Sequence, residues 1–97
     1  MKQLNNQAFK LLNSRFGDKA QIIKAIEELS ELQQVLCHYL NKDVKDGSHM
    51  ETDLLDIATE ITDVRIVTEF LIRIFDIGDL VDRERKRKLM RVINNLK

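Results

Sequence analysis

Two stretches of this sequence decide its fold: residues 25–39, AIEELSELQQVLCHY, and residues 59–70, TEITDVRIVTEF. Each stretch combines apolar residues at helical spacing with an acidic pair three positions apart, Glu28 with Glu31 and Glu60 with Asp63. Side chains three positions apart are neighbours on one face of a helix. If the two helices pack face to face, the four carboxylates meet, and such a group requires a cation because like charges at close range repel.

The position of these acids around each helix separates them from ordinary surface carboxylates. At about 100° per residue, Val64 falls about 40° from Glu60, and Asp63 falls about 60° from it. Glu60 and Asp63 therefore lie within the apolar stripe, where an unpaired charge is costly to bury. Glu28 lies at the border of the stripe on its own helix and Glu31 lies just outside it, so these two could equally be solvated border acids.

The composition predicts one helical domain that spans residues 1–97. The 97 residues include no proline and only three glycines, which favours helices throughout. Sixteen basic residues balance sixteen acidic residues, so the net charge favours neither nucleic acid nor a membrane surface as a partner. The single cysteine excludes an intramolecular disulfide, and no apolar run reaches the roughly 20 residues that span a bilayer. We expect a cytoplasmic protein.

Apolar periodicity and glycine punctuation predict an all-α bundle of about four helices. The helices are expected at about residues 3–14, 18–40, 52–77 and 79–95. Gly17 and Gly78 are the expected stops, and Asp18 and Asp79 are the expected N-caps. The polar residues 41–50 connect the two long central helices, which we expect to be antiparallel.

The third expected helix is apolar around more than half of its circumference, and one neighbouring helix cannot cover so wide a surface. We therefore expect part of the cover to come from a second subunit. Its apolar positions are Leu54, Ile57, Ile61, Val64, Ile66, Val67, Phe70, Leu71, Ile72, Ile74 and Phe75.

The ligand types in the acidic pairs select a hard cation, Mg²⁺ or Mn²⁺, because all of them are oxygens. A di-iron bundle would carry histidines in place of Glu31 and Asp63. A zinc site requires more nitrogen or sulfur ligands than His38, His49 and Cys37 supply. Bound Mg²⁺ often holds substrate phosphates, and the basic fourth helix offers positive charge for a polyphosphate. These features together suggest metal-assisted hydrolysis of a phosphoanhydride.

These motifs resemble those of the MazG-like, all-α nucleoside triphosphate pyrophosphohydrolases, most closely the small phage- and prophage-type members. The resemblance covers most of residues 16–93. It rests on Glu27-Glu28-x-x-Glu31-Leu32 and Glu60-x-x-Asp63-Val64, flanked by Phe16-Gly17, Gln21, Ile77-Gly78 and Lys88-Leu89-x-Arg91. It implies a homodimer or homotetramer that, with magnesium, cleaves a nucleoside or deoxynucleoside triphosphate to the monophosphate and pyrophosphate.

The resemblance also implies roles for individual residues. The metal ligands would be Glu28, Glu31, Glu60 and Asp63. The catalytic acids would be Glu27 and Glu28. Glu27 would either support the metal ligands from outside or orient the water that attacks the α-phosphorus. Lys88 and Arg91 would hold the phosphates of the substrate. Gln21 and Lys24 could also contact the substrate, because they lie on the same helix face as Glu28 and Glu31.

Several of these residues have simpler explanations. Lys24 could do no more than pair with Glu28 four positions away, and the basic residues 83–91 could form a solvated face. Phenylalanines 9, 16, 70 and 75 are expected in the core, although one could stack on a base. Two rival functions stay open: a non-catalytic helical interaction protein that keeps the fold, and a nucleic-acid binder, against which the neutral charge and few aromatic residues argue.

Overall fold

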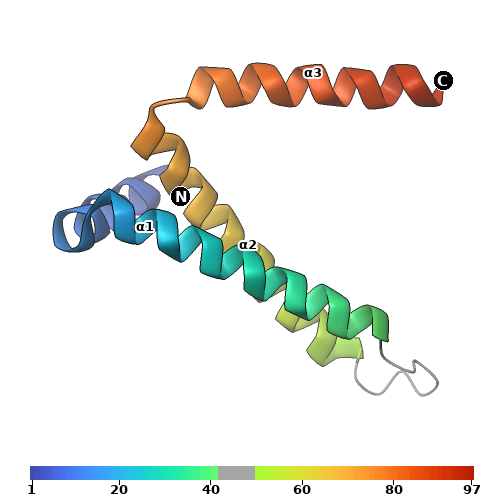
Figure 1. Ribbon diagram of the computed structural model, residues 1–97, viewed down its shortest axis with the longest axis horizontal. Helices are drawn as coiled ribbons and strands as arrows, with labels where there is room; N and C mark the ends of the chain where they lie inside the picture. Colours follow the sequence, from blue (N-terminus) through green and yellow to red (C-terminus); the bar gives the residue numbers. More distant parts are fainter. Residues whose placement is uncertain (42–49) are drawn as a thin grey trace.

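A computed structural model of the chain describes residues 1–41 and 50–97. They form three helices, α1 (Lys2–Asn41), α2 (Met50–Phe75) and α3 (Gly78–Leu96) (Figure 1). No strand is present in these two ranges, so the all-α fold class is confirmed. The connection expected at residues 41–50 falls on positions 42–49, which lie outside the described residues.

Two helical segments are joined at Gly17 within α1. Gly17 has φ 81° and ψ 173°, a conformation that glycine adopts readily because it lacks a Cβ atom. The chain changes direction sharply at this point (Figure 1). The structure therefore has three helices in place of the expected four, since the first two expected helices are parts of α1.

The junction between α2 and α3 differs from the expected stop at Gly78. Asp76 has a positive φ of 53°, and the Ile77 N–H donates to the Ile72 carbonyl oxygen at 3.1 Å. This is the hydrogen bond of a Schellman motif, which ends a helix at a left-handed residue. Gly78 is instead the first residue of α3, and Asp79 lies in its first turn without acting as the N-cap.

The long segment of α1 and α2 lie side by side and run in opposite directions (Figure 1). The residues through which they pack recur at intervals of four and three positions, the repeat of a helix seam. On α1 the buried and half-buried residues of this seam are Gln21, Ala25, Glu28, Leu32, Val35 and Tyr39. On α2 they are Asp53, Ile57, Glu60, Val64, Val67, Leu71 and Ile74.

The two sides of this hairpin differ in polarity. One position before each seam residue the side chains are mostly polar, and we call this side the acidic face. Its polar residues are Lys24, Glu27, Glu31, Gln34 and His38 on α1 and Thr52, Asp56, Thr59, Asp63 and Arg73 on α2. One position after each seam residue they are mostly apolar, and we call this side the apolar face. Its apolar residues are Ile22, Ile26, Leu29, Leu36 and Leu40 on α1 and Leu54, Ile61 and Ile72 on α2. The residues that follow a seam residue point to the same side of the hairpin on both helices. This is because the helices are antiparallel, so the rotation of about 100° per residue has opposite senses on the two helices when both are viewed from one end.

The third helix leaves the hairpin, and within the described ranges α3 makes no contact with α1 (Figure 1). The radius of gyration is 16.9 Å, whereas a compact domain of this length has about 12.5 Å. The expected closed bundle is therefore absent from the single chain. No helix in the described part of the chain is both long enough and apolar enough to cross a membrane.

The core of the isolated chain is small. Among the side chains that the structure describes, the buried apolar residues are Ala25, Val67 and Phe70. The Phe70 ring lies 5.5 Å from the ring of half-buried Phe9. The other two phenylalanines, Phe16 and Phe75, are exposed, so the expectation that they lie in the core is wrong, because no further helix of this chain covers them.

Candidate metal centre

Three carboxylates meet at the boundary between the hairpin seam and the acidic face. Glu28 of α1 and Glu60 and Asp63 of α2 each place one carboxylate oxygen in a group whose members lie within 4.8 Å of one another. Glu28 is only 5% exposed, and the other two are half-buried. Glu28 and Glu60 are brought together because both occupy seam positions, and Asp63 lies almost one turn beyond Glu60 on α2.

The hydrogen bonding of this group is incomplete. Glu28 Oε1 pairs with Lys24 Nζ at 2.9 Å, but within the described residues Glu28 Oε2 and Glu60 Oε2 are buried without a hydrogen-bond partner. A buried carboxylate oxygen without a partner loses its hydration and gains nothing in return. A bound cation would satisfy both oxygens, and an all-oxygen donor set fits a hard cation such as Mg²⁺.

The pKa shifts show that the centre carries more negative charge than Lys24 balances. The hydrogen bond from Lys24 lowers the pKa of Glu28 below its ordinary value. Burial raises the pKa of Glu60, and the charges of Glu31, Asp63 and Glu28 raise it further. The ammonium of Lys24 therefore stabilises one carboxylate, whereas Glu60 remains in a field of like charge that a divalent cation would neutralise.

The fourth predicted ligand, Glu31, lies at the edge of the centre. It is exposed on the acidic face and is not one of the three clustered carboxylates. Its charge nevertheless contributes to the raised pKa of Glu60, which places it close enough to interact. The structure thus brings three of the four predicted ligands together and leaves Glu31 beside them.

The remaining predicted residues of α1 lie around this group in different ways. Glu27 is exposed, with its Oε2 3.8 Å from Lys24 Nζ, and it does not join the carboxylate cluster. The pairing of Lys24 with Glu28 is the simpler explanation that the sequence already offers for this lysine. Gln21 is buried one turn before Ala25 on the seam, and both Gln21 and Lys24 line a cavity next to the cluster.

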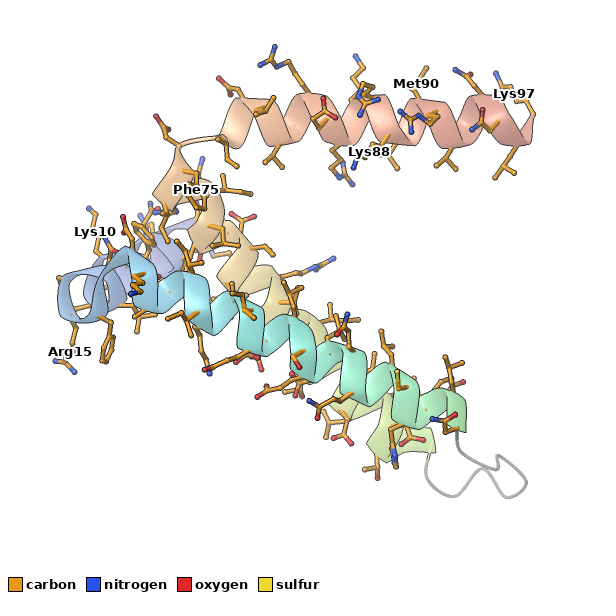
Figure 2. All side chains as sticks on the ribbon, viewed as in Figure 1. Lys10, Arg15, Phe75, Lys88, Met90 and Lys97 are labelled. Carbon is orange, nitrogen blue, oxygen red and sulfur yellow. The ribbon has the colours of Figure 1, made fainter. Side chains whose placement is uncertain are left out.

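Lys88 and Arg91 are not brought to the carboxylates within one chain. Both are exposed on α3, where Figure 2 labels Lys88, and α3 does not touch α1 in the described part of the chain. Their predicted role in holding phosphates therefore has no support from the isolated chain.

The cavity beside the carboxylates was not anticipated from the sequence. Its volume is about 400 Å³, within the range of small-molecule sites. It is lined by Leu12, Phe16, Ala20, Gln21, Lys24, Glu28, Asp63, Ile66, Val67 and Phe70. The sequence signals for it were the possibility that a phenylalanine stacks on a base and the prediction that Gln21 and Lys24 contact the substrate. No local pattern predicts the whole wall, because it is assembled across the Gly17 bend by residues far apart in the sequence.

The chain matches no protein-family model, no curated protein and no solved structure. Any assignment of function therefore rests on the chemistry of the carboxylate group and the cavity.

The raised pKa of Glu60 predicts how the stability of the metal-free protein depends on pH. The folded state binds the Glu60 proton more tightly than the unfolded chain does, so stability falls as pH rises above the ordinary value of 4.5 toward the raised pKa. Glu28 acts in the opposite sense, since its lowered pKa adds stability that is lost as pH falls below 4.5.

The measurement is the melting temperature of the wild type and of Glu60→Gln in EDTA between pH 4 and 8. We expect the variant to gain stability relative to the wild type as pH rises above 4.5, until Glu60 is fully ionised. An equal difference at every pH would show that the pKa of Glu60 is the same in the folded and unfolded states, which contradicts the raised pKa.

Proposed function

We propose that this protein is a magnesium-dependent nucleoside triphosphate pyrophosphohydrolase that cleaves a (d)NTP to the (d)NMP and pyrophosphate. The observation that supports it most directly is the group of Glu28, Glu60 and Asp63, with two buried oxygens that lack partners among the described residues, beside a cavity of ligand size. Carboxylates that hold a divalent cation are typical of enzymes that act on polyphosphates. The resemblance of the two acidic motifs to the MazG-like family agrees with this function.

Each part of the site has a defined task under this proposal. Glu28, Glu60 and Asp63 would hold Mg²⁺, or Mn²⁺ in its place, with Glu31 at the edge as a further ligand. The metal supplies an activated water and neutralises phosphate charge. Lys24, half of whose side chain is exposed beside Glu28, offers an ammonium to the phosphates, and Glu27 stays the predicted residue that orients water.

The test is pyrophosphate release from a panel of canonical and modified NTPs and dNTPs, with Mg²⁺, with Mn²⁺ and with EDTA. We expect release from at least one nucleotide that stops in EDTA and returns when metal is added in excess. A melting curve with Mg²⁺ runs in parallel. No release together with no stabilisation by metal contradicts the proposal.

The alternative function is a non-catalytic helical interaction protein, which the large exposed apolar surface favours. Stabilisation by Mg²⁺ without turnover of any nucleotide would support it. The nucleic-acid binder would require strongly salt-dependent binding to DNA or RNA.

We further propose that the working form is a homodimer or homotetramer. The isolated chain exposes 8224 Å², whereas a compact monomer of 11.4 kDa exposes about 5,800 Å². The excess of about 2,400 Å² is well above the roughly 800 Å² that each partner buries in a standard interface. A second copy of the chain can cover this exposed surface. In a dimer with a two-fold axis, the apolar face of one copy packs against the same face of the other copy.

The apolar face of the hairpin is the surface through which we expect this association. It is exposed on both helices, for example at Ile26 and Ile61, and it faces away from the carboxylates. Association through it would leave the acidic face of each copy open to substrate. The uncovered apolar side of α3, which carries Leu89, Val92, Ile93 and Leu96, would add to the interface.

A further inference from the structure

The cavity beside the carboxylates has two chemically different ends. At one end Glu28, Asp63 and Lys24 line it, and these are the groups to which we assign the metal and phosphates. The rest of the wall is mainly apolar and comes from both segments of α1 and from α2, with Phe16 and Phe70 as its aromatic residues. A ligand that fits this shape has a charged end and an apolar end.

One polar group lies in the apolar part of the wall. Gln21 is only 7% exposed, and its Nε2 donates a hydrogen bond to Asn13 Oδ1 at 2.8 Å. Its Oε1 is buried and has no hydrogen-bond partner among the described residues. Asn13 therefore fixes the carboxamide in an orientation that leaves one acceptor free, and a buried acceptor of this kind is costly unless a ligand supplies the donor.

We propose that this cavity binds the nucleobase of the substrate, and that Gln21 Oε1 accepts a hydrogen bond from an N–H group on the edge of the base. A nucleobase matches the wall because it has flat apolar faces and a polar edge with N–H donors. In a nucleotide the base is joined through the sugar to the phosphates. A base in the cavity would therefore place the phosphates near the carboxylates and Lys24, which line the same cavity. The inference rests on the proposed function, and it assigns Gln21, which was predicted only to contact the substrate, and Asn13 to base recognition.

An aliphatic ligand fits the same wall less well. A lipid chain has no donor for Gln21 Oε1, so its binding would leave that buried oxygen unsatisfied. Phe16 lines the cavity and is exposed, so its ring is available to stack on a planar base, and stacking of this kind contributes about 1–3 kcal/mol per base.

The test uses nucleosides without phosphates, in EDTA, so that neither metal nor hydrolysis is needed. Adenosine, cytidine, guanosine and uridine are titrated into the ¹⁵N-labelled full chain, and the side-chain amide signals of Gln21 and Asn13 are followed. We expect at least one nucleoside to shift the Gln21 signal. Backbone signals then report the affinity of Gln21→Met, which we expect to fall about 5- to 10-fold because one hydrogen bond is lost.

The matched control is Gln7→Met, which changes an exposed glutamine of the same helix and should leave the affinity unchanged. Phe16→Ala is a second variant, since Phe16 is 60% exposed and its removal should weaken nucleoside binding about tenfold without affecting the fold. Melting curves of every variant verify folding.

The outcomes separate this inference from the proposed function. If no nucleoside shifts the signals of the cavity, or if Gln21→Met and Phe16→Ala bind as tightly as the wild type, the base-binding cavity is wrong even where metal-dependent hydrolysis is found. If nucleosides bind as expected but no triphosphate is hydrolysed, the cavity stands and the hydrolase assignment fails.

Discussion

Glu60→Gln is expected to lower pyrophosphate release by at least about 100-fold, because it replaces a charged ligand with a neutral amide at the centre of the carboxylate group. The same change should raise the melting temperature of the metal-free protein. Burial and the neighbouring charges of Glu31 and Asp63 raise the pKa of Glu60, so the ionised side chain destabilises the fold at neutral pH. Pyrophosphate release and melting curves in EDTA measure the two effects on the same preparations.

The matched control is Glu69→Gln, which makes the same chemical change at an exposed position of α2. Glu69 lies about 180° around the helix from Glu60, so its variant should keep both the activity and the response to Mg²⁺. Near-normal turnover by Glu60→Gln would refute the metal centre proposed for Glu28, Glu60 and Asp63. Loss of turnover in both variants would point to a general effect of charge instead.

Ile26→Asp is expected to dissociate the oligomer. Ile26 is 62% exposed in the isolated chain, so the aspartate is solvated in the monomer, but association through the apolar face would bury it without a partner. A penalty of about 3 kcal/mol weakens association by more than 100-fold. Light scattering after size-exclusion chromatography, over a range of protein concentrations, measures the change in mass.

Leu55→Asp controls for the introduction of a charge. Leu55 is 67% exposed, but it lies about 120° around α2 from Ile61, away from the apolar face. The Leu55→Asp variant should therefore keep the oligomer mass of the wild type. Ile61→Asp, which changes the apolar face, should dissociate the oligomer as Ile26→Asp does. A wild-type chain that is monomeric at every concentration, or an Ile26→Asp variant that keeps the wild-type mass, would exclude this interface.

The helical class and the positions of the acids could be predicted from local sequence, because both depend on the 3.6-residue period. Glu60 within an apolar stripe was the strongest signal, and the structure places it on the seam with Glu28. Glu31 was harder to place, since a residue one position from the seam can join the cluster, as Asp63 does, or lie beside it. Whether such an acid reaches the cluster depends on how the two helices are rotated against each other.

The sequence patterns predicted neither the direction of α3 nor the cavity. These features depend on the backbone conformation of single residues and on contacts between residues far apart in the sequence. The left-handed conformation of Asp76 directs α3 away from the hairpin, and no periodicity in α3 predicts the direction in which it leaves. Lys88 and Arg91 consequently lie away from the carboxylates in the isolated chain. The cavity depends on the bend at Gly17, which sets Asn13 within hydrogen-bonding distance of Gln21 although eight positions separate them.

The small core has a consequence for how this protein is maintained in a cell. Few apolar side chains of the single chain are shielded from water, so the free energy gained by burial within one copy is low compared with the entropy cost of ordering the chain. If the chain associates as we propose, folding and association are one equilibrium, and the folded fraction rises with the concentration of the chain. Halving its synthesis would remove more than half of the assembled protein, and newly made chains would be sensitive to proteases until they meet a second copy.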